Sequence, residues 1–186
     1  MGGDCMFSNF DNRKCIIDVE MTNDLWEGQL VCVGVMNLDA DNHVIQSFTG
    51  SYEETLLKDF LDYFNHHQFT EIIGFNCTWD IRVILSRCMK YRLRADAIYR
   101  ARCTDLMMIL KGFGKGYNYN EVGSLDMWSK FLGGPGKMKT GTTIADLYKM
   151  GKWSEITAYN ECDLKLTFDL WERLNTVIGG RTNENA

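Results

Sequence analysis

The chain has 186 residues, of which 45% are hydrophobic and 24% are charged, and its net charge is −5. These values suit one globular domain with its own core, and they exclude a low-complexity or strongly charged disordered chain. The sequence has no run of about 18 apolar residues for a membrane span, and residues 1–14 lack the apolar segment of a secretory signal. We therefore expect a cytoplasmic protein.

The positions of the charged residues and of the cysteines bear on nucleic-acid binding and on metal binding. Residues 82–139 contain 12 Lys or Arg and four Asp or Glu residues, whereas the rest of the chain is acidic. A basic segment is compatible with a groove for a polyanion, and equally with surface charge that is uneven only in sequence. The seven cysteines form no CxxC pair and no zinc spacing with the three histidines, so we interpret them as free thiols.

Hydrophobic periodicity predicts a sheet and two helices in the first half of the chain. Short runs rich in β-branched residues indicate strands at 14–21, 29–38, 43–48 and 70–75. DADN between the second and third runs predicts a hairpin. Helices are predicted at 51–67, where Ser51 is the expected cap, and at 79–90.

The second half alternates between predicted strands, helices and loops. We predict a strand leading into a helix at 101–110, a loop at 112–123, and helices at 124–133, 142–151 and 154–177. A strand meander followed by alternation favours an α/β fold with a mixed sheet and helices on its faces. The predicted domain spans 14–178, between an N-terminal tail (1–13) and a disordered C-terminal tail (179–186).

Two carboxylates interrupt the apolar strand predicted at residues 14–21. Asp18 and Glu20 are two residues apart and therefore lie on the same face of a strand. Like charges so close together raise each other's pKa, and burial adds to this effect, so a cation is the usual remedy. The alternative is a strand end that reaches solvent, and the DxE pattern alone does not decide between the two.

A second acidic position follows the strand predicted at residues 70–75. Asn76 comes directly after this strand, and Asp80 opens the next helix. Ligands of open α/β sheets bind at the carboxyl ends of strands, which places both side chains at a potential site. Asp80 also has a simpler explanation, because the helix dipole favours a carboxylate in the first turn.

The last predicted helix carries Tyr159 and Asp163, four residues apart. Residues at this spacing share a helix face, so the phenol and the carboxylate point the same way. For this helix alone, a solvated carboxylate beside a packed tyrosine is the simpler interpretation. Together with Asp18, Glu20 and Asp80, however, Asp163 completes four oxygen ligands of the kind that Mg²⁺ and Mn²⁺ prefer.

These three segments, in their order and spacing, resemble the three motifs of the DEDDy branch of the DnaQ-like 3′–5′ exonucleases. IIDVE (16–20) resembles the first motif, GFNCTWD (74–80) the second and AYNECD (158–163) the third. Residues 124–174 are in addition similar to stand-alone relatives of the proofreading exonuclease domain of family B DNA polymerases. The chain has no histidine after His67, which excludes the branch that uses histidine in place of the tyrosine.

The resemblance implies a ribonuclease-H-like fold, with a mixed sheet, an antiparallel hairpin and helices on both faces. It also implies two divalent cations, Mg²⁺ or Mn²⁺, and hydrolysis of phosphodiester bonds from the 3′ end that releases 5′-mononucleotides. By the same resemblance, Asp18 bridges both cations, Glu20 and Asp163 complete the first site and Asp80 holds the second. Tyr159 then positions the attacking water.

Six residues near the motifs are candidates for substrate contact: Met21, Thr22, Trp26, Asn76, Lys137 and Lys139. The first three follow the first motif and are placed to contact the terminal base, with core packing as an equal alternative for Trp26. Asn76 is expected to support the second motif or to contact the terminal nucleotide. The two lysines resemble the family's basic loop and are candidates for phosphate contacts.

We therefore expect a metal-dependent exonuclease of single-stranded 3′ ends, with DNA favoured over RNA. Two alternatives stay open. The motifs do not distinguish 2′-OH from 2′-H, so an RNA-trimming exoribonuclease is one alternative. The other is a non-catalytic nucleic-acid-binding accessory protein, against which the five intact motif residues argue. A protein partner in replication, repair, or a phage or defence system is a further expectation.

Overall fold

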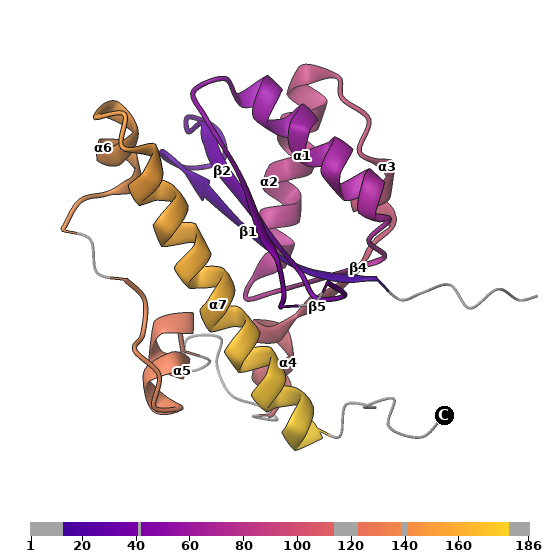
Figure 1. Cartoon of the computed structure of the whole chain (residues 1–186), viewed down its shortest axis with the longest axis vertical. Helices are drawn as coiled ribbons and strands as arrows, with labels where there is room; N and C mark the ends of the chain where they lie inside the picture. The colour runs from indigo at the N-terminus through magenta and orange to yellow at the C-terminus, as the bar shows by residue number, and fades with distance from the viewer. Residues whose placement is uncertain (1–12, 41, 114–122, 139–140, 179–186) are drawn as a thin grey trace, which may run out of the picture.

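The computed structural model describes residues 13–40, 42–113, 123–138 and 141–178. Five strands of these residues form one sheet, and seven helices pack around it (Figure 1). The strands are β1 (Lys14–Met21), β2 (Leu30–Asn37), β3 (Ile45–Thr49), β4 (Glu71–Gly74) and β5 (Arg102–Asp105). The helices are α1 (Glu53–His67), α2 (Cys77–Tyr91), α3 (Asp96–Arg100), α4 (Leu106–Phe113), α5 (Leu125–Phe131), α6 (Ile144–Lys149) and α7 (Trp153–Ile178).

The sheet is mixed, with the strand order β3-β2-β1-β4-β5. β2 pairs antiparallel with both β1 and β3, whereas β4 pairs parallel with both β1 and β5. The hairpin predicted from DADN is present between β2 and β3. The predicted mixed sheet with an antiparallel hairpin is therefore confirmed, and β1 coincides with its predicted strand.

Side chains of β1 alternate between two hydrophobic cores on opposite faces of the sheet. Cys15, Ile17 and Val19 pack with α1 and α2, whereas Ile16 packs with α7. In Figure 1, α7 crosses one face of the sheet and α1 and α2 cover the other. The predicted helices on both faces are confirmed. The alternation also means that Asp18 and Glu20, in phase with Ile16, face α7.

One local expectation was wrong, and one helix was not predicted. The N-cap of α1 is Tyr52 rather than Ser51, and no side chain caps this helix. A tertiary contact holds the start of the helix instead, because the carboxylate of Glu53 accepts a hydrogen bond from the Leu30 backbone N–H (2.8 Å). The short helix α3 was not predicted, since five residues are too few to show a 3.6-residue period.

Several predictions fall outside the described residues. These are Lys139, the predicted tail 179–186, residues 1–12 of the N-terminal tail, and residues 114–122 of the predicted loop. The proposed domain boundaries therefore stay predictions. Among the helices that the structure describes, none combines the length and the apolar character needed to cross a membrane.

Candidate active site

The carboxyl-terminal half of β1 extends beyond its parallel neighbour. β1 pairs with β4 only as far as Ile16 and Ile73, whereas its pairing with β2 continues to Met21. Beyond Ile16, backbone groups of β1 on this side have no strand partner. The carboxylate of Asp80, in the first turn of α2, accepts a hydrogen bond from the Val19 N–H (3.1 Å) in this place. Because β4 ends before β1 does, Asp80 of the second motif can contact the part of β1 that carries the first motif.

The third motif reaches the same strand from the opposite face. Each of Asp18, Glu20 and Asp163 offers one carboxylate oxygen, and these three atoms lie within 4.8 Å of one another. Asp163 is 2% exposed, and its Oδ1 is buried without a hydrogen-bond partner. Together with Asp80, these residues are called the carboxylate cluster below. The sequence-predicted acids are therefore brought together by β1, α2 and α7.

A glycine allows α7 to approach the sheet at this point. Gly34 of β2 lies opposite Asp18, and a Cβ atom added to Gly34 would lie 1.8 Å from Oδ1 of Asn160. The amide of Asn160 donates to the backbone oxygen of Asp18 (3.1 Å) and to its carboxylate Oδ2 (2.8 Å). Sequence analysis missed this role, although Asn160 lies three residues before Asp163 and so shares its helix face.

A buried carboxylate outside the cluster holds the turn of the second motif. Asp105, at the end of β5, accepts hydrogen bonds from the backbone N–H groups of Asn76 (2.9 Å) and Thr78 (3.3 Å). Asn76 itself has a left-handed backbone with φ of 63°, which an asparagine tolerates better than most residues. Asp105 therefore caps the start of α2 and fixes the turn that precedes Asp80.

Lys137 is the basic residue that contacts the cluster among those the structure describes. Its backbone N–H donates to Asp126 of α5 (2.8 Å), and Gly136 beside it donates to the hydroxyl of Ser129 (3.1 Å). The loop after α5 is thereby fixed, and the Lys137 ammonium forms an ion pair with Asp163. The same ammonium lies 5.8 Å from the ring centroid of Tyr159.

Burial raises the pKa of every carboxyl group in the cluster, and neighbouring carboxylates raise it further. For Asp18, burial is the largest cause, and the charges of Glu20, Asp80 and Asp163 raise the pKa further. Burial likewise raises the pKa of Glu20 to about 8, that of Asp80 to about 7, and that of Asp163. The positive charge of Lys137 opposes these shifts without cancelling them. A cluster short of positive charge is one that a divalent cation stabilises.

The remaining predicted residues differ in accessibility. Tyr159 is half-buried, and burial raises the pKa of its phenol, which therefore keeps its proton at neutral pH. Trp26 is 86% exposed, so the alternative of core packing does not hold for it. Met21 is buried in the core on the side of α1, and the hydroxyl of Thr22 accepts from the Gln29 N–H (2.9 Å).

Part of the basic segment is paired with acids from other parts of the chain. Among its described residues, Arg87 and Lys90 pair with Glu53, and Arg102 pairs with Glu71. These acids belong to α1 and β4, outside the basic segment in sequence. Tertiary contacts thus neutralise part of a charge excess that the sequence presents as one block.

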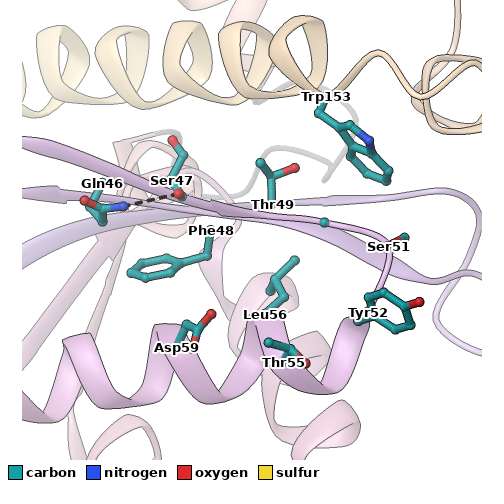
Figure 2. Close-up of a pocket in the computed structure, with 11 residues that line it drawn as sticks. Gln46, Ser47, Phe48, Thr49, Ser51, Tyr52, Thr55, Leu56, Asp59 and Trp153 are labelled. Atoms are coloured by element: carbon teal, nitrogen blue, oxygen red, sulfur yellow. Dashed lines mark hydrogen bonds between the residues drawn. The ribbon is translucent and has the colours of Figure 1, made fainter.

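A separate pocket lies away from the carboxylates. It has a volume of about 720 Å³ and follows the edge strand β3 and the start of α1 (Figure 2). Phe48 and Leu56 contribute to its floor, and Trp153 and Tyr52 stand at its rim. None of the predicted site residues lines it. The carboxylates therefore occupy a different part of the molecule.

Comparison with known proteins connects this geometry to a family. Residues 97–186, a little under half of the chain, match a family described as a predicted 3′–5′ exonuclease related to the exonuclease domain of PolB. The match includes Lys137, Tyr159 and Asp163 and begins after the first two motifs. The search of curated proteins returned no match.

The structure adds a likeness over most of the chain. The family B DNA polymerase from the hyperthermophilic archaeon Pyrobaculum calidifontis aligns with 87% of the chain at a TM-score of 0.67 and 15% sequence identity. At this identity the likeness concerns the fold, whereas the similarity to PolB-related exonucleases comes from residues 97–186. The chain spans about a quarter (24%) of that polymerase, and the alignment supports the predicted ribonuclease-H-like fold.

Proposed function

We propose that this chain is a metal-dependent 3′–5′ exonuclease of the DEDDy type, which hydrolyses single-stranded nucleic acid and releases 5′-mononucleotides. The observation that carries the proposal is the meeting of three predicted motifs at one place. Oxygens of Asp18, Glu20 and Asp163 lie within 4.8 Å of one another, and Asp80 contacts the same strand. The match of residues 97–186 to PolB-related exonucleases supports the reaction and its direction.

The residues present fit divalent cations. Carboxylate oxygens are the preferred ligands of Mg²⁺ and Mn²⁺, and the buried Oδ1 of Asp163 lacks a partner. Asp18, Glu20 and Asp163 would hold one ion, and Asp18 and Asp80 a second. When bound, the ions lower the pKa of the attacking water and stabilise charge at the scissile phosphate and the leaving 3′-oxygen.

The surrounding residues of the chain position the reactants. Asn160 holds the carboxylate of Asp18, and Asp105 holds the turn before Asp80. Tyr159 lies one helical turn from Asp163, and in this proposal its protonated phenol forms a hydrogen bond with the attacking water. In the presence of ions, the Lys137 ammonium is free to leave Asp163 and contact the phosphate.

Substrate contacts are proposed at both sides of the cluster. Trp26 offers an exposed indole on which the terminal base can stack, and Thr22 precedes it in the turn after β1. Met21 is not placed for this contact, because its side chain is buried in the core on the side of α1. Asn76, the N-cap residue of α2, contacts the terminal nucleotide in this proposal. Lys139 joins Lys137 as a phosphate contact in this proposal. DNA is the favoured substrate, and the protein is proposed to act in the cytoplasm.

The direct test is a time course on single-stranded DNA and RNA labelled at the 3′ or the 5′ end. Each substrate is incubated with Mg²⁺, Mn²⁺ or EDTA. We expect a metal-dependent ladder that shortens from the 3′ end in the wild type. Asp18→Ala should abolish it, whereas Asp169→Asn, on the partly exposed face of the same helix as Asp163, should not.

The outcomes separate the remaining functions. A faster ladder on RNA than on DNA would replace the favoured substrate by the exoribonuclease alternative. Intact substrate with every metal, accompanied by a gel shift, would refute the enzyme and leave a nucleic-acid-binding accessory protein. The five intact motif residues favour turnover over binding alone.

A further inference from the structure

Two thiols meet at the base of the second motif. Cys77 is the first residue of α2, and Cys103 lies on the neighbouring strand β5. Their sulfur atoms are 3.3 Å apart and form a hydrogen bond. Among the described cysteines, this is the pair whose sulfur atoms lie in contact, although the two residues are 26 positions apart in sequence. Neither thiol takes part in the proposed exonuclease reaction.

The two thiols differ in accessibility and in acidity. Cys103 is exposed, whereas Cys77 is buried. The hydrogen bond between the two sulfur atoms lowers the pKa of Cys103, and the same bond together with burial raises the pKa of Cys77. An accessible thiol of lowered pKa beside a second thiol is the arrangement of a cysteine that reacts with oxidants and is then resolved by its neighbour.

We propose that Cys77 and Cys103 form a reversible disulfide when the protein meets a peroxide. The Cys103 sulfur attacks one oxygen of the peroxide, and the O–O bond breaks. Cys103 becomes a sulfenic acid, and when the peroxide is hydrogen peroxide the other oxygen leaves as water. The Cys77 sulfur then attacks the Cys103 sulfur, and its thiol proton leaves with the hydroxyl group as a second water. Two thiols are oxidised and one peroxide is reduced. A small thiol such as dithiothreitol reverses the bond by exchange.

The position of the bond connects it to the candidate active site. Cys77 directly follows Asn76 and precedes Asp80 by three residues. Thr78, the next residue, is held by Asp105, two residues after Cys103. A covalent bond would therefore join β5 to the turn that carries the second motif, at a point where hydrogen bonds already hold the two elements together.

The test uses the full-length reduced protein, hydrogen peroxide in small excess and a free-thiol count. We expect the count to fall by two, from seven, and peptide mapping to recover a linked pair of fragments containing residues 77 and 103. Dithiothreitol should restore both thiols. Cys103→Ser should keep its remaining six thiols under the same treatment, because the accessible partner is removed at an exposed position where folding tolerates serine.

Cys162→Ser is the matched control, since Cys162 is partly exposed and lies on α7, away from the pair. This variant should still lose two thiols. The proposal is overturned if the wild type keeps all its thiols, or if the linked fragments contain other cysteines. It is also overturned if Cys103→Ser loses thiols as the wild type does. The readout is chemical, so it stands or fails independently of exonuclease activity.

Discussion

The molecule buries carboxylates in two regions and treats them in opposite ways. In the first region, Glu53 is 4% exposed and accepts hydrogen bonds from Leu30 N–H (2.8 Å), Tyr91 hydroxyl (2.7 Å) and Lys90 (3.0 Å). Arg87 lies 3.2 Å from the same carboxylate. Burial opposes the ionisation of Glu53, but these partners outweigh burial and lower its pKa.

In the second region, the carboxylate cluster is left without such compensation. Burial raises the pKa of its members, and Asp163 keeps a buried oxygen without a hydrogen-bond partner. Among the described residues, Lys137 is the cation that pairs with Asp163. A structural carboxylate is satisfied by the protein itself, whereas a ligand carboxylate keeps its oxygens for something outside the chain. We propose that this difference separates a site that serves stability from one that serves function, and it can be tested.

Neutralising Asp18 should give the largest effect. Asp18→Asn keeps the shape of the side chain but removes a charge shared by both proposed ions. We expect exonuclease activity to fall by at least about 10³-fold, because several kcal/mol of charge stabilisation are lost and about 1.4 kcal/mol corresponds to tenfold. The midpoint of thermal unfolding should not fall, since a repulsive charge disappears. Activity above about a hundredth of the wild type would contradict a metal-ligand role.

Neutralising Glu53 should have the opposite profile. Glu53→Gln leaves Arg87 buried without its ionic partner, so we expect the free energy of unfolding to fall by about 3 kcal/mol. Urea unfolding followed by fluorescence measures this change. Activity per folded molecule should match the wild type, because Glu53 lies outside the carboxylate cluster. A stable but inactive variant would invalidate the distinction between the two regions.

Removing the phenol of Tyr159 should have an intermediate effect. Tyr159→Phe keeps the ring beside Lys137 but loses the group proposed to orient the water, so kcat should fall by about 10²-fold. KM should change by no more than a few-fold, because binding does not depend on the hydroxyl. Steady-state kinetics on a labelled oligonucleotide checks this, with the exposed Tyr99→Phe as control. A rise in KM with unchanged kcat would assign Tyr159 to substrate binding.

The side-chain amide of Asn160 should affect activity by orienting Asp18. Asn160→Ala removes both hydrogen bonds to that residue, and we expect a loss of about 10- to 100-fold in activity or in metal affinity, as is typical for groups that orient a ligand. Raising the Mn²⁺ concentration should recover part of the activity. A variant that binds Mn²⁺ as tightly as the wild type and is fully active would show that Asn160 serves only packing over Gly34.

The pH dependence of metal affinity should also distinguish the two regions. Glu20 and Asp80, with pKa values of about 8 and 7, are largely protonated at pH 6, and cations must displace these protons. Mn²⁺ affinity should therefore rise by up to about tenfold per pH unit for each displaced proton between pH 6 and 8. Titration calorimetry measures it, and a constant affinity would contradict the raised pKa values.

The same pKa shifts determine how the stability of the metal-free protein changes with pH. In the unfolded chain these carboxyl groups lose their protons near pH 4. Between that pH and about 8, the folded cluster holds more protons than the unfolded chain, so the metal-free protein becomes less stable as pH rises. The lowered pKa of Glu53 acts in the opposite sense, and its contribution is complete above pH 5.

Much of the fold and the identity of the acids could be predicted from sequence. β1 coincides with its predicted strand, and the period of two along a strand is enough to place Asp18 and Glu20 on one face. The helical period does the same for Tyr159 and Asp163. These are local regularities of the backbone, and a sequence carries them directly.

Relations between distant segments could not be read in this way. The contact of Asn160 with Asp18 joins residues 142 positions apart, and the ion pair of Lys137 with Asp163 depends on a loop fixed by α5. The block of basic residues in the sequence is partly neutralised by acids from other elements.

The sequence by itself determined which residues can carry charge, and which of them share a strand or helix face. Tertiary structure alone decided which charges are compensated. Glu53 and Glu20 are both buried glutamates, yet one is surrounded by donors and the other by further carboxylates. The pKa of a buried group depends on every neighbour within a few ångströms, and most of those neighbours come from distant parts of the chain.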